Sequence, residues 1–185
     1  MSGETTRNKD RDENLLQKFQ RIRSFVFDVD GVLTDGSLLI PDDGQMVRRM
    51  NIKDGYALQL ALKQGYHVVV ISGGHSEAVR ERLNRLGVKD VFLKVTDKKE
   101  CLLTYAAQHT LSLDEMLFMG DDIPDYTVMK IVGLACAPAD AAAEIKQVSH
   151  YISYLPGGAG CARDVIEKVL KLNKSWPLGT EVPSK

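Results

Sequence analysis

Residues 24–36 read SFVFDVDGVLTDG, and the architecture of this chain can be worked out from them. The segment begins with a short run of β-branched and aromatic residues, which favours a buried β-strand. It continues into carboxylates and glycines, which favour a loop. Further apolar runs lie at 67–71, 91–93, 116–119 and 134–137. Segments with helical periodicity separate these runs, and the alternation predicts an α/β fold with a doubly wound, Rossmann-like parallel sheet.

The predicted helices span about 54–63, 76–86, 98–109, 124–131, 141–147 and 163–172. One segment interrupts the alternation of strands and helices. Residues 37–50 form two extended arms around the turn sequence PDDG at 41–44. This pattern predicts a β-hairpin that projects from the carboxyl side of the first strand.

Composition narrows the class of protein. The chain has 185 residues, with 24 Lys and Arg against 25 Asp and Glu, so we expect neither a nucleic-acid nor a membrane partner. A chain of this length favours a single domain. We assign residues 1–23 to a polar tail with a short helix, 24–173 to the domain and 174–185 to a mobile tail. Three widely spaced cysteines and the lack of a long apolar run predict a soluble, cytoplasmic protein.

Functional side chains follow each of the first four predicted strands. In open α/β sheets, ligands bind beyond the carboxyl ends of the strands. The residues found there are Asp28 and Asp30, then Ser72, Gly73 and Gly74, then Lys98, and finally Asp121, Asp122 and Asp125. Crowded carboxylates repel one another unless a cation intervenes. Oxygen ligands without imidazole or thiolate predict Mg²⁺.

The remaining groups suit a phosphate. Ser72, Lys98 and the backbone N–H groups of Gly73 and Gly74 would supply hydrogen-bond donors and one fixed positive charge. Each feature also has a simpler interpretation, because Asp-x-Asp is common in solvated turns and Ser72, Lys98, Asp122 and Asp125 could simply begin helices. Their joint occurrence beyond successive apolar runs favours a phosphate site.

These four motifs, FVFDVDGV at 25–32, VVISG at 69–73, Lys98 and GDDIPD at 120–125, resemble those of the haloacid dehalogenase superfamily of phosphohydrolases. The resemblance implies that Asp28 forms an aspartyl-phosphate and that Asp30 serves as general acid and base. It further implies phosphoryl contacts from Ser72, Gly73 and Lys98. Mg²⁺ would be held by Asp28, the Asp30 backbone carbonyl and Asp121. Asp122 and Asp125 would orient Lys98 or metal-bound waters.

Within that superfamily the chain looks like a branch without a cap domain, the tetrameric 3-deoxy-D-manno-octulosonate 8-phosphate phosphatases of lipopolysaccharide synthesis. Residues 51–56 and the GGAGCAR sequence at 157–163 carry this resemblance. It implies a homotetramer in which a neighbouring subunit helps to cap the site. The candidate substrate contacts are Lys53, Asp54, His75 and Arg163. Gly74 departs from the branch, because many members place an arginine there to contact the sugar acid.

Other functions stay open at this point. An acylneuraminate or nonulosonate 9-phosphate phosphatase, or a phosphomutase, would use the same motifs. A phosphoacceptor signalling module also places aspartates and a lysine on a doubly wound sheet, but it would not need the acid–base group Asp30. An inactive, scaffold-like relative is a further alternative, although every catalytic residue type is present.

Overall fold

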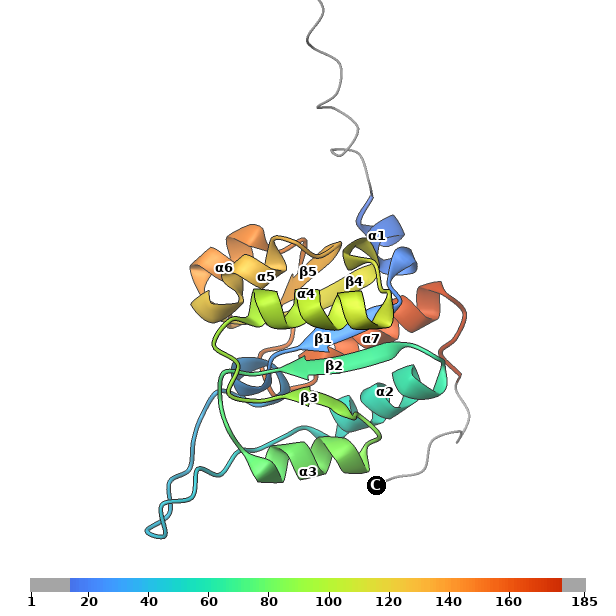
Figure 1. Ribbon diagram of the computed structural model, residues 1–185. Coiled ribbons are helices and arrows are strands. Elements are labelled where there is room, and N and C mark those ends of the chain that lie inside the picture. Colours follow the sequence, from blue (N-terminus) through green and yellow to red (C-terminus); the bar gives the residue numbers. More distant parts are fainter. Residues whose placement is uncertain (1–13, 178–185) are drawn as a thin grey trace, which may run out of the picture.

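The computed structural model describes residues 14–177 and contains one six-stranded parallel sheet (Figure 1). The strands are β1 (Ser24–Phe27), β2 (His67–Ile71), β3 (Asp90–Phe92), β4 (Met116–Met119), β5 (Leu134–Ala137) and β6 (Tyr151–Ile152). Their order is β3-β2-β1-β4-β5-β6, so the chain winds outward in both directions from the central β1. This order confirms the predicted doubly wound α/β sheet.

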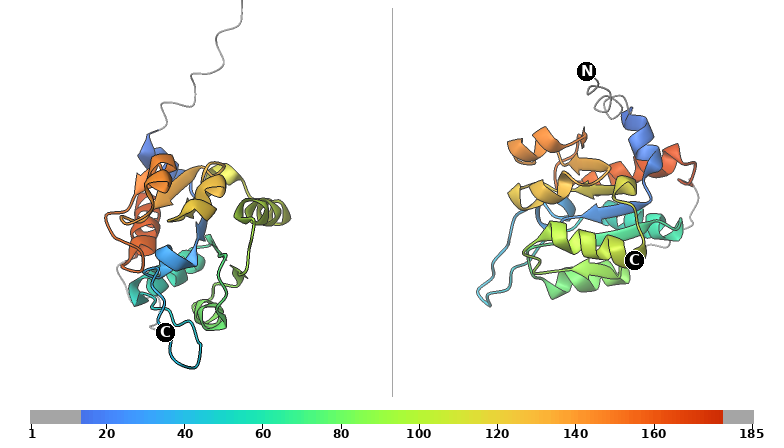
Figure 2. Two further views of the ribbon diagram at one scale, coloured as in Figure 1. Left: turned by 90° about the vertical axis from the view of Figure 1, so that its left-hand side faces the viewer. Right: turned by 45° about the horizontal axis from the view of Figure 1, so that its top comes forward.

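Helices cover both faces of the sheet, as the two views of Figure 2 show. They are α1 (Leu15–Arg21), α2 (Ile52–Lys63), α3 (Glu77–Arg85), α4 (Lys98–His109), α5 (Tyr126–Met129), α6 (Ala143–Val148) and α7 (Cys161–Leu172). Successive side chains of a strand point to opposite faces. Phe25 and Phe27 therefore pack with α1, α2, α3 and α7, whereas Val26 packs with α4, α5 and α6. β1 is buried along its whole length, and burial on both faces explains its apolar run from Phe25 to Phe27.

One strand and the form of one helix differ from the prediction made from the sequence. β6 was not predicted, because two residues are too few to give a periodic signal. The helix predicted at 124–131 is instead a short turn at Ile123–Asp125 followed by the four-residue α5. Pro124 suits the first turn of such a segment, but only one further turn follows it.

Residues 37–50 project away from the sheet as a narrow loop, visible at the lower left of Figure 1. Its two arms are joined by one antiparallel bridge, Leu39 to Val47, and its base is closed by a second, Thr34 to Met50. The predicted hairpin is therefore present, although with minimal strand pairing. Between residues 14 and 177 the structure contains no separate cap domain.

The ends of the chain are described in part. Asn14 caps α1, so the short helix predicted before residue 23 is present, whereas the polar tail at 1–13 lies outside the described residues. The mobile tail predicted from 174 needs a correction at its start, because Trp176 packs edge-on against Tyr56 with 6.2 Å between ring centroids. Residues 178–185 lie outside the described part. No helix between residues 14 and 177 has the length and apolar character needed to cross a membrane.

Candidate active site

The sheet order brings the predicted functional segments to one edge. β1 lies between β2 and β4, so Asp28, Ser72 and Asp121 follow the ends of three adjacent strands. A pocket of about 330 Å³ forms there. The residues lining it are Asp28, Asp30, Gly36, Ser72, Gly73, Gly74, Lys98, Asp121, Asp122, Pro124 and Asp125. All the residues predicted to act in catalysis and in phosphate or metal binding therefore line a single pocket.

Lys98 begins α4 and is buried between two carboxylates. Its Nζ lies 3.0 Å from Asp28 Oδ1 and 2.6 Å from Asp125 Oδ1. Burial alone would lower the pKa of Lys98, but the charges and hydrogen bonds of Asp28 and Asp125 raise it overall. The side chain therefore stays a cation that is fixed in place at the pocket.

Asp125 connects this cation to the loop after β4. Its side chain is almost fully buried, and its second oxygen accepts a hydrogen bond from the backbone N–H of Asp121 at 3.1 Å. Asp122 is exposed, and its carboxylate accepts from the N–H of Ile123 at 2.8 Å. Of the two residues expected to orient Lys98 or metal-bound waters, Asp125 contacts Lys98, whereas Asp122 caps the following turn.

Three carboxylates form a cluster suited to a cation. One oxygen each of Asp28, Asp121 and Asp125 lies within 4.8 Å of the others. Burial, followed by the charge of Asp125, raises the pKa of Asp28 to about 7. Burial, followed by the charge of Asp28, raises the pKa of Asp121 to about 7. These carboxylates carry more negative charge than Lys98 offsets.

The hydrogen bonding of Asp28 supports the same conclusion. Its buried Oδ1 accepts no hydrogen bond within residues 14–177 beyond the ion pair with Lys98. An oxygen with free lone pairs beside a second carboxylate is a suitable ligand for a hard divalent cation. The residues present therefore fit the Mg²⁺ predicted from the sequence.

Gly31 shows how tightly the loop after β1 packs against this cluster. Its φ is +86°, and a Cβ placed on it would lie 2.0 Å from Asp121 Oδ2. Only glycine combines this backbone conformation with that lack of side-chain volume. The glycine-rich segment before α7 packs on the same loop, since a Cβ on Gly157 would lie 2.1 Å from the Gly31 carbonyl oxygen.

Asp30 lines the pocket but faces a different partner. Arg48, on the second arm of the 37–50 loop, places Nε 2.6 Å from Asp30 Oδ1 and Nη2 3.1 Å from Oδ2. The sequence did not single out Arg48, because no local pattern brings residue 48 to residue 30. The adjacent Arg48 and Arg49 after the turn are the one signal that could have suggested it.

Ser72 is buried at the end of β2, and its Oγ accepts the N–H of Gly74 at 3.1 Å. This contact holds the loop after β2 in a compact turn beside Lys98. Gly73 is exposed at the tip of that turn. Both residues therefore lie where the sequence predicts phosphate contacts.

The four candidate substrate contacts lie elsewhere in the single chain. None of Lys53, Asp54, His75 and Arg163 lines the pocket of about 330 Å³. His75 is exposed and pairs with Glu77 at 2.9 Å. Asp54 is buried and accepts a hydrogen bond from the backbone N–H of Arg163 at 2.7 Å, so it joins α2 to α7.

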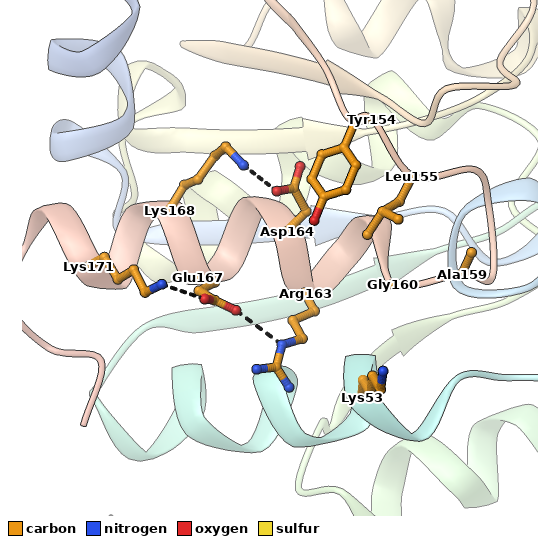
Figure 3. Close-up of a pocket in the computed structure, with 10 residues that line it drawn as sticks. All are labelled: Lys53, Tyr154, Leu155, Ala159, Gly160, Arg163, Asp164, Glu167, Lys168 and Lys171. Atoms are coloured by element: carbon orange, nitrogen blue, oxygen red, sulfur yellow. Dashed lines mark hydrogen bonds and ion pairs between the residues drawn. The ribbon is translucent and has the colours of Figure 1, made fainter. Parts of the chain in front are cut away.

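Arg163 and Lys53 lie at a second pocket, of about 520 Å³ (Figure 3). The Arg163 side chain points toward Glu167, with Nε 3.1 Å from its carboxylate. Its guanidinium also lies 5.3 Å from the centre of the Trp176 ring. Arg163 therefore lies outside the pocket that holds the carboxylate cluster.

Comparison with known proteins agrees with this geometry. The sequence profile of haloacid dehalogenase-like hydrolases matches residues 89–156. The 3-deoxy-D-manno-octulosonate 8-phosphate phosphatase KdsC of Yersinia pestis is 29% identical over 158 residues, which cover 85% of this chain and 84% of that protein.

Two solved structures extend the comparison. One is the same phosphatase from Moraxella catarrhalis, solved in complex with magnesium ion, phosphate ion and a molecule of 3-deoxy-D-manno-octulosonate (KDO). It is 29% identical to this chain with a TM-score of 0.82, and the match covers 85% of this chain and 90% of that one. A putative haloacid dehalogenase superfamily hydrolase of subfamily III A from Legionella pneumophila is 30% identical with a TM-score of 0.84, covering 87% and 89%. This chain therefore belongs to the haloacid dehalogenase superfamily of hydrolases.

Proposed function

We propose that this protein is a Mg²⁺-dependent phosphatase that hydrolyses 3-deoxy-D-manno-octulosonate 8-phosphate in lipopolysaccharide biosynthesis. The observation that carries the proposal is the buried cluster of Asp28, Asp121 and Asp125 beside Lys98. It occurs in a chain that aligns over most of its length with phosphatases for this ester, one of them solved with magnesium, phosphate and KDO.

Asp28 is the proposed nucleophile. A carboxylate oxygen attacks phosphorus as the bond from phosphorus to the sugar oxygen breaks, which leaves an aspartyl-phosphate on Asp28. Attack by an anion on a phosphate dianion is opposed by charge repulsion. Lys98 offsets part of this repulsion from 3.0 Å away.

Asp30 is the proposed general acid and general base. It gives a proton to the sugar oxygen as that oxygen leaves. It then takes a proton from the water that attacks phosphorus, as the bond from phosphorus to the Asp28 oxygen breaks and inorganic phosphate is released. Ser72, the N–H of Gly73 and Lys98 hold the phosphoryl oxygens during both steps. Asp28, Asp121 and the backbone carbonyl of Asp30 would hold Mg²⁺, which supplies positive charge to the phosphoryl oxygens when bound.

We also propose that the protein works as a homotetramer in which a neighbouring subunit helps to cap the site. Two observations support this arrangement. The described chain has no cap domain, and the projecting 37–50 loop exposes 68% of Leu39 and 64% of Ile40. The three free cysteines, Cys101, Cys136 and Cys161, support the cytoplasm as the compartment.

Phosphate release from 3-deoxy-D-manno-octulosonate 8-phosphate tests the proposed function. We expect turnover with Mg²⁺ and none after EDTA treatment. Asp28→Asn should lower kcat by at least about 10³-fold, because the nucleophile is removed. Asp114→Asn, at an exposed position outside the pocket, is the matched control and should keep full activity.

Two results would count against the proposal. Unchanged turnover in EDTA or in Asp28→Asn would refute the assigned nucleophile and metal site. A higher kcat/KM for a nonulosonate 9-phosphate than for the octulosonate ester would instead favour the alternative substrate. Circular dichroism of Asp28→Asn should match the unmodified protein, so that loss of activity is not loss of fold.

A further inference from the structure

Arg48 forms an unusual link between the 37–50 loop and the acid–base group. Only 6% of its side chain is exposed, although it lies on a projecting segment, whereas the neighbouring Arg49 is 84% exposed. Nε and Nη2 bind the two oxygens of Asp30, and Nη1 donates to the backbone carbonyl of Met46 at 3.1 Å. All three guanidinium nitrogens are engaged, so the side chain forms a rigid connection between the loop backbone and Asp30.

Asp30 has little else to fix its orientation. Its side chain is 36% exposed, and the remaining hydrogen bond, from Thr34 Oγ1, is long at 3.5 Å. A bidentate contact from a guanidinium group defines both the position and the plane of a carboxylate. Arg48 therefore sets the orientation of the Asp30 carboxylate in the pocket.

Gly74 belongs to the same arrangement. Its φ does not lie in the positive region, so the backbone does not require glycine there. A Cβ at this position would lie 2.9 Å from Asp30 Oδ2 and 3.4 Å from Arg48 Nη2. The ion pair thus occupies the space beside Gly74, and an added methyl group would shift the Asp30 carboxylate.

We propose that Arg48 is a positioning residue for Asp30, and that Gly74 leaves room for the pair. The proposal rests on the proposed phosphatase function. Proton transfer to a leaving oxygen needs the carboxylate at a defined place, and a misplacement of about 1 Å costs on the order of 10²-fold in rate. The conformation of the 37–50 loop is thereby coupled to the protonation of the leaving group.

The chemistry of the first step provides a selective readout. As the Asp28 oxygen bonds to phosphorus and the ester bond breaks, the electron pair passes to the leaving oxygen. A sugar alkoxide needs the proton from Asp30, whereas p-nitrophenolate is stable without one. The ratio kcat/KM covers the steps up to departure of the leaving group, so it isolates this difference from the later hydrolysis of the aspartyl-phosphate.

The experiment measures kcat/KM for 3-deoxy-D-manno-octulosonate 8-phosphate and for p-nitrophenyl phosphate, both with Mg²⁺. We expect Arg48→Ala to lose about 10- to 100-fold on the sugar ester and less than about 3-fold on the aryl ester. Arg48→Lys should keep a higher kcat/KM on the sugar ester than Arg48→Ala, since lysine keeps the positive charge but cannot make the bidentate contact. Arg49→Ala, on the same arm, should change neither value.

Gly74→Ala is a second variant with an intact Arg48. The nearest atom to the new methyl group is the end of the flexible Asp30 side chain, so the carboxylate moves and the fold persists. We expect the same selective loss on the sugar ester, with an unchanged thermal melting temperature. Agreement between the two variants would assign the effect to the position of Asp30.

The outcomes are distinct. Equal losses on both esters in Arg48→Ala and Gly74→Ala, or full activity of both variants on the sugar ester, would overturn the role of Arg48. An unmodified protein that hydrolyses neither ester would overturn the proposed phosphatase function, and with it the positioning role.

Discussion

Asp28 and Asp30 are two residues apart, line the same pocket and have different surroundings. Asp28 is buried against Lys98, whereas Asp30 is partly exposed and bound by Arg48. Different roles for two nearby carboxylates depend on such differences in environment. The proposed nucleophile is thus held by a buried lysine of the domain core, and the proposed acid by an arginine of a projecting loop.

Gly31→Ala tests the close packing of the loop after β1. We expect Mg²⁺ to bind at least about 10-fold more weakly and turnover to fall at least as far, because the new methyl group would displace the Asp121 carboxylate. Isothermal titration with Mg²⁺ and phosphate release would measure the two effects.

Gly65→Ala is the matched control. Gly65 has a φ of +83°, close to that of Gly31, but no atom lies within 4 Å of its added Cβ. It should lose about 1 kcal/mol of stability from backbone strain and keep normal turnover. Equal metal affinity in the two variants would contradict the packing argument.

At the scale of single residues, sequence predicts best the groups that follow strands. Asp28, Ser72 and Asp121 could be placed because strand ends in a parallel sheet converge. Arg48 could not be placed, because its contact with Asp30 depends on how the 37–50 loop folds back. Arg163 could not be placed either, since its side chain turns toward Glu167 and Trp176, which no local pattern indicates.

At the scale of elements, the short apolar runs and the helical periodicity of residues 98–109 predicted type and position well. β2, β4, β5 and α4 have the bounds expected from the sequence. Short elements were harder, because a two-residue strand and a four-residue helix owe their existence to neighbouring elements and not to their own pattern. The turn sequence predicted the 37–50 hairpin, but it did not predict that a single bridge, Leu39 to Val47, would join the two arms.

The exposed apolar side chains of that loop lead to a prediction about assembly. The double variant Leu39→Glu/Ile40→Glu should convert the proposed tetramer into smaller species, because burying charge at an apolar contact is unfavourable. If a neighbour caps the site, KM for the sugar ester should rise by roughly 10-fold, since about 1.4 kcal/mol of binding would be lost.

Light scattering after size-exclusion chromatography would measure the assembly. Gln45→Glu, also exposed on this loop, is the control and should leave the assembly unchanged. A variant that is monomeric with an unchanged KM would show that neighbouring subunits do not help to cap the site.

At the scale of the whole molecule, the carboxylate cluster should make the stability of the metal-free protein depend on pH. The folded pKa values of Asp28 and Asp121 are about 7, above their ordinary value of 3.8. Between these limits the folded state binds more protons than the unfolded state, so the free energy of unfolding falls as pH rises from about 4 to about 7. Below about pH 4 both carboxyl groups are protonated in the folded and in the unfolded state, so stability no longer changes with pH. Above about pH 7 both groups are ionised, and the folded state carries the full free-energy cost of burying their charges.

Denaturant unfolding of EDTA-treated protein at several pH values would measure this trend. Asp121→Asn should flatten the slope, because it removes one of the three cluster carboxyl groups, Asp28, Asp121 and Asp125, whose pKa is raised. Mg²⁺ should restore stability mainly near pH 7 and above, where the carboxylates are ionised. A slope between pH 4 and 7 that is identical in Asp121→Asn and the unmodified protein would contradict the cluster as its cause.

The order of the sheet also bears on how the protein is made. β1 pairs with β4, from Ser24 beside Met116 to Phe27 beside Met119, although β2, β3 and their helices come between them in the chain. A nascent polypeptide emerging from the ribosome has therefore made Asp28 long before it has made Asp121. The proposed metal site therefore stays incomplete until β4 has been made and has paired with β1.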